Sequence, residues 1–522
     1  MHMWRVLVTD EMRLGTHDLP DLQLDYRPGL PREEILERIG EYDALITRSR
    51  TQVDRELLER AARLKVIGRG GVGVDNIDLE EASRRGILVI NVPEANTRSA
   101  AELAFGLMLA AARLIALSDR ELRRGEWNRK HLGLELLDKS LGIVGLGRIG
   151  GQVAQFARAF GMEVWAYDPY ISSKRAENLG VRLVDRLETL LPEVQFLTVH
   201  TPLNEETRDL VGRRELYLLP EGAVVVNAAR GGIVNEAALS DLLDEGHLFA
   251  AGLDVFADEP PDPEHPLLNH PRVVHTAHLG ANTQEAQARV GHGIVERVYE
   301  ALSGNYAYAI NAGFDPEAFQ ALKGWLPLAE ALGRLLAQIT RGRAQALEVA
   351  VLGGFDCEPE PVYAAVAKGV LEPVIDEPVN YVSSRPRLEE RGVRLVSRRD
   401  PDARGFAQAI EVRLVTDREE RRAMGTVLAG RPRLVGIDDY ALEIEPAGAM
   451  LVCINRDQPG VVGRVGTLLG EAGVNIAGLQ LGRDAPGGRA LFVLAVDEPP
   501  PEEVLEQLRG LELLERVDAA WL

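Results

Sequence analysis

Three glycines at a fixed spacing constrain the fold of this chain more than any other feature. The segment 141–151 reads LGIVGLGRIGG and places a G-x-G-x-x-G pattern at Gly145, Gly147 and Gly150. An apolar run precedes the pattern and a helical run follows it, so the glycines allow a tight strand-to-helix turn and the close approach of a pyrophosphate to the helix N-terminus. The pattern lies well inside the chain, so we expect a separate α/β unit before it, to which the chain later returns.

An acidic residue follows this pattern at the distance typical of a dinucleotide-binding fold. The run 162–168 reads MEVWAYD and ends on Asp168, eighteen residues beyond Gly150. A carboxylate at the end of this second strand accepts hydrogen bonds from an adenosine ribose and repels a 2′-phosphate, which favours NAD over NADP. A glycine-bearing turn without any ligand is the alternative, but it leaves the succession of strand, helix, strand and terminal Asp unexplained.

The size and charge of the chain limit the classes of protein to which it can belong. With 522 residues, of which 46% are hydrophobic, the chain is long enough for about three to four globular domains. Its formal net charge of -21 argues against binding to the phosphate backbone of a nucleic acid or to an anionic membrane surface. An anionic ligand therefore needs a local basic pocket.

The sequence predicts no membrane span, no secretion signal and no metal site. The longest apolar run, 100–117, is interrupted by charged residues and is interpreted as one buried helix, which begins with a capping-box pattern at Ser99 and Glu102. The chain begins directly as a strand, MHMWRVLVTD. The two cysteines, Cys357 and Cys453, lie far apart without clustered histidines, which argues against a disulfide framework and a zinc site. We expect a cytoplasmic protein.

Alternating apolar and helical runs predict two lobes in the first part of the chain. Residues 4–92 alternate short apolar strands with helical runs, which is typical of a parallel α/β sheet. We predict a first, substrate-binding lobe formed by residues 1–95 plus 284–311, and a dinucleotide-binding lobe, residues 96–283, inserted into it. Two lobes related in this way have a cleft between them.

The C-terminal part of the chain adds two further units. Residues 312–445 contain an amphipathic helix and several strands, and we predict an intervening α/β domain there. Over residues 449–522 the runs follow the order βαββαβ, which is the ferredoxin-like arrangement. The predicted fold class is therefore α/β, with doubly wound parallel sheets in two Rossmann-type lobes, an α/β intervening domain and a ferredoxin-like C-terminal domain.

Three charged residues follow predicted strands of the dinucleotide-binding lobe, where the carboxyl ends of parallel strands line a ligand crevice. Arg230 lies in NAARGG, Glu259 in LDVFADEPP and His278 in TAHLGANT. Oxidation of a hydroxyl by a nicotinamide needs a proton acceptor, and the ordinary pKa of histidine, about 6.5, suits His278 to that task. A carboxylate beside the imidazole raises its pKa and selects its tautomer, which is the role that we assign to Glu259. The planar fork of Arg230 suits a substrate carboxylate.

Each of these residues also has a purely structural interpretation. His278 can be an ordinary histidine at a strand end, Glu259 a turn residue within DEPP, and Arg230 a surface arginine in a tight turn. Three other histidines of the same lobe are interpreted as structural or solvated, namely His265, His270 and His275.

Seven motifs occur in an order that resembles the D-isomer-specific 2-hydroxyacid dehydrogenases. They are GRGGVGVDNID, VPEANTRSAAE, GLGRIG, HTPL, NAARGGIVNE, LDVFADEPP and HLGANT, all within residues 1–311. The resemblance implies NAD as the cofactor and Arg230, Glu259 and His278 as the catalytic set. Besides the three glycines, it implies cofactor contacts at Val72, Arg148, Ile149, Asp168, Thr201, Ala228, Ala229, Arg230, Asp254, His278, Gly280 and Ala281.

The complete order of units is similar to that of the long members of this family, which act on a phosphorylated 2-hydroxy acid. This resemblance implies NAD-dependent oxidation of 3-phospho-D-glycerate to 3-phosphooxypyruvate, the first step of L-serine biosynthesis. The family's phosphate-site arginines fall on Arg48 and Arg129, whereas Arg50 is equally well interpreted as a solvated loop residue. The alternatives are a glyoxylate or hydroxypyruvate reductase, another D-2-hydroxyacid dehydrogenase or, in a different class, an NAD-sensing corepressor on the same scaffold.

The C-terminal unit resembles an ACT regulatory domain. Its NRDQPG and GVNIA segments place Asp457 and Asn475 where serine-sensing relatives contact the amino acid, which implies L-serine as an effector bound between neighbouring subunits. Asn455 stands at a position that such relatives often fill with Tyr or His. The alternative is a unit that serves only as an assembly surface. We expect a homodimer or a homotetramer.

Overall fold

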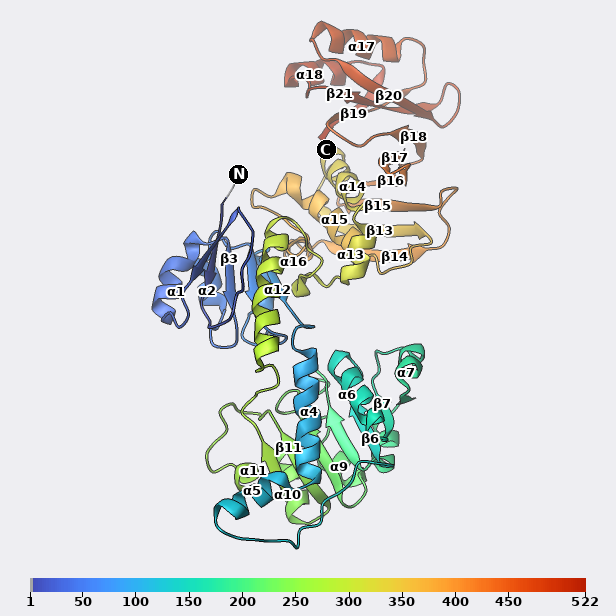
Figure 1. Cartoon of the computed structure of the whole chain (residues 1–522). Helices are drawn as coiled ribbons and strands as arrows, with labels where there is room; N and C mark the ends of the chain where they lie inside the picture. The colour runs from blue at the N-terminus through green and yellow to red at the C-terminus, as the bar shows by residue number, and fades with distance from the viewer. Residues whose placement is uncertain (1–2) are drawn as a thin grey trace.

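The computed structural model describes residues 3–522, and its strands form four separate sheets (Figure 1). The first lobe contains a five-stranded parallel sheet in the order β2-β1-β3-β4-β5. Its elements are β1 (Trp4–Val8), β2 (Leu22–Tyr26), α1 (Arg32–Arg38), β3 (Ala44–Thr47), α2 (Arg55–Arg60), β4 (Val66–Arg69), α3 (Leu79–Arg84) and β5 (Leu88–Asn91), together with α12 (Gln284–Leu302) from later in the chain.

Helices cover both faces of this first sheet, because its central strands are apolar on both sides. β3 and β5 are buried along their whole length, as expected for parallel strands between two helical layers. On one face α12 packs so closely on β4 that a Cβ at Gly68 would lie 2.6 Å from a methyl group of Val298. The return of α12 to this sheet makes the first lobe discontinuous in sequence.

The second lobe contains seven parallel strands in the order β12-β11-β10-β9-β6-β7-β8. Its strands are β6 (Ser140–Val144), β7 (Glu163–Tyr167), β8 (Arg182–Val184), β9 (Phe196–Val199), β10 (Ala223–Asn227), β11 (Leu248–Leu253) and β12 (Val273–His275). Its helices are α4 (Thr97–Ala112), α5 (Ile115–Arg123), α6 (Arg148–Ala159), α7 (Ser173–Leu179), α8 (Leu187–Leu190), α9 (Arg213–Leu218), α10 (Glu236–Asp244) and α11 (Pro266–Asn269). The strand order reverses between β6 and β9, which is where a doubly wound sheet binds its ligand.

The apolar run 100–117 forms two helices, so the prediction of one continuous helix is wrong. Leu114 adopts a left-handed φ of 52° between α4 and α5, and the two helices are bent by 64°. The predicted capping box is also not formed in the described chain, where Ser99 Oγ lies 2.9 Å from Thr283 Oγ1 instead. Across residues 3–522 no single helix is long and apolar enough to cross a membrane, although the bent pair meets that test of length and composition together.

The carboxyl ends of both parallel sheets face the junction between the two lobes. The chain passes from the end of β5 to α4, and it returns from the end of β12 to α12 (Figure 1). All strands within each sheet run in the same direction. The carboxyl ends of all strands of a sheet therefore lie on the side from which the chain crosses to the other lobe. The junction therefore collects the loops that follow the strands of both lobes.

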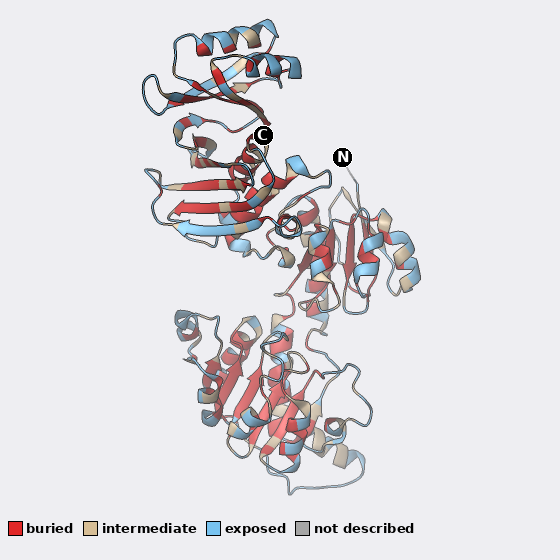
Figure 2. Ribbon diagram, turned by 180° about the vertical axis from the view of Figure 1, so that it is seen from behind, coloured by how far each residue is buried: buried red, intermediate tan, exposed pale blue. Residues whose placement is uncertain are grey.

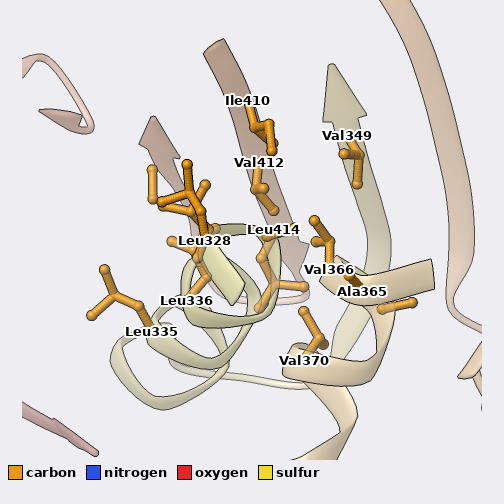
Figure 3. Close-up of a cluster of buried hydrophobic side chains, with 14 of the residues drawn as sticks. Leu328, Leu335, Leu336, Val349, Ala365, Val366, Val370, Ile410, Val412 and Leu414 are labelled. Carbon is orange, nitrogen blue, oxygen red and sulfur yellow. The ribbon is translucent and has the colours of Figure 1, made fainter. Parts of the chain in front are cut away.

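A six-stranded mixed sheet forms the third unit, in the order β14-β13-β15-β16-β17-β18. Its elements are α13 (Pro316–Leu322), α14 (Leu326–Ile339), β13 (Ala344–Gly353), α15 (Glu360–Leu371), α16 (Ser384–Glu390), β14 (Arg394–Asp400), β15 (Gln408–Thr416), β16 (Glu420–Leu428), β17 (Arg431–Ile437) and β18 (Tyr440–Ile444). Figure 3 shows how leucine and valine side chains of α14 and α15 gather against β13 and β15. In this sheet the central strands β13 and β15 are largely buried, whereas the edge strand β14 is mostly exposed (Figure 2).

An antiparallel sheet in the order β20-β21-β19-β22 ends the chain. Its elements are β19 (Ala449–Arg456), α17 (Val461–Glu471), β20 (Ile476–Arg483), β21 (Arg489–Val496), α18 (Glu502–Arg509) and β22 (Leu514–Trp521). The predicted order βαββαβ is confirmed, and so is the α/β fold class. Alternate residues of β19 serve two cores: Leu451 and Cys453 pack under α17 and α18, whereas Met450 and Val452 join the core of the third unit.

Candidate active site

The glycine loop between β6 and α6 leaves open space beside the helix N-terminus. Gly145 has a φ of 93°, which favours glycine, and a Cβ there would lie 2.7 Å from the carbonyl oxygen of His200. A Cβ at Gly150 would overlap the carbonyl oxygen of Gly145. At Gly147, by contrast, a Cβ would meet no described atom within 4 Å. The loop offers an anion room next to backbone N–H groups that have no partner within their own helix.

Asp168 lies directly after β7 and beside the glycine loop, as the sequence predicts. One of its carboxylate oxygens accepts a hydrogen bond from the Leu146 N–H at 2.8 Å, and the other accepts one from the Tyr170 N–H at 2.9 Å. Each oxygen of an ionised carboxylate can accept more than one hydrogen bond, so both keep capacity for the hydroxyls of a ribose. Asp168 therefore orders the loop and stands where the second strand of such a fold contacts an adenosine ribose.

A buried hydroxyl at the end of β9 fits a ligand in the same crevice. Thr201 Oγ1 is buried without a hydrogen-bond partner anywhere in residues 3–522, and the side-chain methyl group of Thr201 lies close to Gly145. Buried hydroxyls are normally hydrogen-bonded, so this orphaned atom indicates a partner that binds there. The open glycine loop, the Asp168 carboxylate and this hydroxyl together fit a dinucleotide.

The segment after β10 is held in place by one buried amide. Asn227 accepts a hydrogen bond from the Ala229 N–H at 3.1 Å and donates one to the carbonyl oxygen of Arg230 at 2.9 Å. These two bonds hold Ala228 and Ala229 at the carboxyl edge of the sheet, next to the crevice. They also determine where the side chain of Arg230 leaves the backbone.

A buried carboxylate after β11 orders the loop that carries His278. Asp254 accepts hydrogen bonds from the Thr276 hydroxyl at 2.5 Å, the Leu279 N–H at 2.7 Å and the Gly280 N–H at 2.9 Å. The backbone of His278 has a φ of 53°, in the left-handed region, so these bonds hold it in a conformation that few residues adopt. Asp254 was predicted as a cofactor contact, and its bonds within the chain show that it organises this loop.

His278 and Glu259 form a directly bonded pair. His278 Nδ1 lies 2.7 Å from Glu259 Oε2, and the other carboxylate oxygen accepts the Phe256 N–H at 3.2 Å. The hydrogen bond that His278 donates to Glu259 raises the pKa of His278, although burial acts in the opposite direction. Burial acts to raise the pKa of Glu259, but the bond and the charge of His278 outweigh it and lower that pKa. With Nδ1 turned to the carboxylate, Nε2 is the nitrogen that can take up a proton.

Arg230 reaches from the second lobe to the first across the junction. Its Nη1 donates to the carbonyl oxygen of Ala229 at 2.7 Å, and its Nε lies 3.5 Å from Asp75 Oδ2 in the loop after β4. A Cβ at Gly73 would overlap Arg230 Nη2, so glycine is required where the guanidinium lies. The positive charge of Arg230 also lowers the pKa of both members of the pair formed by His278 and Glu259, which places these groups in one site.

The first lobe adds two arginines at the carboxyl ends of neighbouring strands. Arg48 directly follows β3 and is held through its N–H, which donates to Asp10 at 2.7 Å. Arg69 ends β4, and sequence reasoning missed it because the residue closes an otherwise apolar strand. Its Nε is buried and lacks a partner within residues 3–522. Burial and the charges of Arg230 and Arg48 lower the pKa of Arg69 to about 10. A charged residue at the carboxyl end of β4 is the sequence signal that points to it.

The structure does not bring Arg129 to these arginines within one chain. The loop around Arg129 is anchored at the far ends of α4 and α5, where the Leu134 N–H donates to Ala112 at 2.8 Å and His131 lies 2.8 Å from Glu121. The N-terminal end of α4 lies at the lobe junction, and the 16 residues of this helix correspond to about 24 Å of length. Within one chain, Arg129 therefore lies away from the lobe junction that holds Arg48 and Arg69.

The remaining predicted cofactor positions lie in loops that follow strands or at the start of a helix. Val72 follows β4 in the first lobe, and its carbonyl oxygen accepts a hydrogen bond from Asn91 at 2.6 Å. Arg148 and Ile149 begin α6, and Ala281 follows the loop of His278, where its carbonyl oxygen accepts a bond from a glutamine side chain at 2.9 Å. Among the described residues no cluster of His, Cys, Asp or Glu could hold a metal ion.

The two predicted effector residues of the last unit do not meet within one chain. Asp457 accepts a hydrogen bond from the Gly487 N–H at 3.1 Å and pairs with Arg483, the last residue of β20. Asn475 precedes the first residue of β20 and donates to Asp497 at 2.7 Å. The eight residues of β20 thus separate the two side chains by roughly 25 Å. A site that contains both requires two copies of the chain.

Comparisons with known proteins identify the family of this fold. Residues 105–280 match the NAD-binding domain of the D-isomer-specific 2-hydroxyacid dehydrogenases, residues 321–438 match the intervening domain of D-3-phosphoglycerate dehydrogenase, and residues 449–513 match the ACT domain. A glyoxylate reductase from Paecilomyes thermophila has a similar structure, with 32% identity and a TM-score of 0.53, over 58% of this chain and 97% of that one.

Two curated relatives match nearly the whole chain. The D-3-phosphoglycerate dehydrogenase of Archaeoglobus fulgidus is 41% identical over 507 residues, which cover 96% of each chain. The enzyme of the same name from Methanocaldococcus jannaschii is 39% identical over 515 residues and 98% of each chain.

The two lobes, the glycine loop and the residues at the strand ends define an NAD-dependent dehydrogenase of the D-isomer-specific 2-hydroxyacid class. The agreement over nearly the full length narrows this class, because it includes the intervening and ACT domains that the two-lobed glyoxylate reductase match does not cover. The chain belongs to the D-3-phosphoglycerate dehydrogenase family. The predictions of family, fold class and NAD as cofactor are confirmed.

Proposed function

We propose that this chain catalyses the NAD-dependent oxidation of 3-phospho-D-glycerate to 3-phosphooxypyruvate in the cleft between its two lobes. The observation that carries the proposal is the meeting of the bonded pair His278 and Glu259 with the guanidinium groups of Arg230, Arg48 and Arg69. The pair supplies a proton acceptor, and the arginines supply positive charge for a substrate that carries both a carboxylate and a phosphate. The names of the two full-length relatives support the same substrate.

His278 takes the proton of the substrate hydroxyl in this proposal. Its Nδ1 is bonded to Glu259 at 2.7 Å, so the neutral imidazole keeps an acceptor lone pair on Nε2. When the proton arrives, the ring becomes a cation, and the adjacent carboxylate stabilises that cation. NAD, when bound, supplies the acceptor for the hydride that leaves C2 of the substrate.

The arginines divide the two anionic groups of the substrate between the lobes. Arg230 stands beside His278 and suits the carboxylate next to the reacting carbon, because its planar fork binds a carboxylate through two hydrogen bonds. Arg48 and Arg69 lie at the carboxyl ends of neighbouring strands of the first lobe and suit the phosphate. This division predicts that changes to Arg69 act mainly on phosphorylated substrates.

A substrate panel tests the proposal. NAD reduction is measured with 3-phospho-D-glycerate, D-glycerate and D-lactate, and we expect kcat/KM to be about 100-fold higher for the phosphorylated acid, since hydrogen bonds between charged groups contribute roughly 1.5–3 kcal/mol each. Arg69→Met should reduce this preference. Rates with D-lactate or D-glycerate equal to the rate with 3-phospho-D-glycerate would contradict the proposed substrate. Faster reduction of glyoxylate or hydroxypyruvate would favour a reductase. Binding of NAD without turnover would favour the corepressor.

We propose further that the chain works as a homodimer or homotetramer in which Arg129 serves the cleft of a neighbouring copy. The loop of Arg129 carries two largely exposed apolar side chains, with Trp127 80% and Leu132 84% exposed, which is typical of a surface that a partner covers. Light scattering measures the oligomeric state. Mixed oligomers of Arg129→Ala and His278→Ala subunits should regain activity, because one cleft then receives an intact residue of each kind; a monomeric active enzyme would contradict this.

L-serine is the effector that we propose for the ACT domain, bound by Asp457 of one copy and Asn475 of another. The distance of these residues within one chain supports a site shared between copies. We expect serine to inhibit 3-phospho-D-glycerate oxidation and Asn475→Ala to relieve that inhibition. Activity that stays constant across millimolar serine would leave the domain with the assembly role alone.

A further inference from the structure

Asp75 contacts Arg230 at the edge of the guanidinium that a substrate carboxylate would bind. Nη1 of Arg230 is already engaged by the carbonyl oxygen of Ala229 at 2.7 Å. The opposite edge, formed by Nε and Nη2, faces the loop after β4: Nε lies 3.5 Å from Asp75 Oδ2, and Nη2 lies over Gly73. The same Asp75 oxygen lies 2.7 Å from the place of a Cβ at Gly73. Asp75 therefore lies at the edge of the guanidinium formed by Nε and Nη2, whereas Nη1 already donates to a backbone carbonyl oxygen.

This ion pair is loose enough to be exchanged. The side chain of Asp75 is 75% exposed, whereas that of Arg230 is 29% exposed. A pair with one solvent-exposed partner contributes little free energy, because water stabilises the exposed carboxylate almost as well as the guanidinium does. A substrate carboxylate that binds the same edge through two short hydrogen bonds forms a stronger pair. Asp75 can then turn into solvent without leaving a buried charge behind.

We propose that Asp75 is an internal counter-ion of Arg230, which the substrate carboxylate displaces, so that the residue helps to determine which ligands occupy the cleft. Before substrate binds, Asp75 holds the guanidinium extended across the lobe junction. A neutral ligand cannot replace it, whereas a carboxylate can, so the exchange selects for carboxylates. The cost of the exchange reduces the affinity for the substrate. This inference rests on the proposed role of Arg230 as the carboxylate anchor.

Asp75→Asn tests the exchange, because it removes the competing charge and keeps the shape of the side chain. We expect KM for 3-phospho-D-glycerate to fall about two- to five-fold, the range that an exposed ion pair supports, and Asp75→Glu to keep KM near its original value. Glu80→Gln is the matched control, since Glu80 is exposed on the adjacent helix α3 and this change also removes one negative charge. An unchanged KM, or a KM that rises as it would after damage to the loop, overturns the proposal.

A second comparison separates exchange at Arg230 from a general effect of charge. In an Arg230→Gln background, Asp75→Asn should no longer change KM, because the edge for which the two carboxylates compete is gone. If the same two- to five-fold fall persists there, Asp75 acts only as a negative charge near an anionic substrate, and the counter-ion role is excluded. If the wild-type chain oxidises a different 2-hydroxy acid, the substrate claim fails, while the same KM comparison made with that acid still tests Asp75.

Discussion

The two junctions between units of this molecule are built from different interactions. At the junction of the two lobes, the described contacts include an exposed ion pair between Arg230 and Asp75 and a hydroxyl contact of 2.9 Å between Ser99 and Thr283. At the junction of the intervening and ACT domains, α14 and the strands of the last sheet share one apolar core. The first junction can open and close at small cost in free energy, whereas the second joins two domains into one body.

Buried charges strengthen the second junction further. Arg516 of β22 pairs with Glu419 at 2.6 Å and also bonds Asp518 and the carbonyl oxygen of Ile339. The hydrogen bonds from Arg516 lower the pKa of Glu419 to about 2, although burial opposes this shift. A ligand that moves the ACT domain therefore moves the intervening domain with it. The comparison teaches that the proposed active site lies at the junction held by exposed polar contacts, whereas the ACT domain is joined to its neighbour by an apolar core and buried ion pairs.

The largest effect should follow a change at the lobe junction. His278→Ala removes the proposed proton acceptor, and we expect kcat for 3-phospho-D-glycerate to fall about 10²- to 10⁴-fold, the usual contribution of a positioned acid or base. The melting temperature should stay close to that of the wild type, because the side chain is about half exposed. Steady-state kinetics and thermal unfolding check both points. A variant that keeps most of its kcat would remove His278 from the mechanism.

A change at the second junction should act on stability and leave the chemistry intact. Arg516→Ala leaves Glu419 and Asp518 without their shared cation, and we expect the C-terminal body to lose about 3 kcal/mol of unfolding free energy. Arg489→Ala is the control: it breaks a pair with Glu515 whose arginine is 59% exposed, so its cost should stay below about 1 kcal/mol. Denaturant unfolding measures both variants. Equal losses would show that the buried ion pairs of Arg516 contribute no more to stability than an exposed ion pair does.

The smallest predicted effect concerns pH. The hydrogen bond that His278 donates to Glu259 raises the pKa of His278. Oxidation requires the neutral imidazole, so kcat/KM should rise with pH through that raised pKa. Glu259→Gln removes the charge, and the acidic limb of the profile should move to lower pH, because a lower pKa leaves the ring neutral over a wider range. Profiles of kcat/KM against pH for both proteins measure the shift. A limb that stays in place, or moves to higher pH, contradicts the pairing.

Much of the site could be predicted because it consists of local patterns. The glycine loop, Asp168 and the strand-end positions of Arg230 and His278 follow from turn chemistry and from strands whose carboxyl ends share one edge. Arg69 was missed because a charged residue that ends a buried strand gives no periodic signal. The long helix predicted over residues 100–117 was wrong because the apolar pattern continues through Leu114, where the backbone turns left-handed.

The sequence by itself indicated two parallel α/β lobes, the NAD-binding loop, the βαββαβ order at the C-terminal end and the residues that stand at the strand ends. Hydrophobic periodicity and glycine placement carry this information because they act over a few neighbouring residues. Only the tertiary structure decided which distant residues meet. It set Arg230 against Asp75 across the lobe junction, it placed Arg129 away from that junction, and it separated Asp457 from Asn475 within one chain. The physical reason is that such contacts depend on how whole helices and sheets pack against one another. A local sequence pattern does not determine where residues far away in the sequence lie.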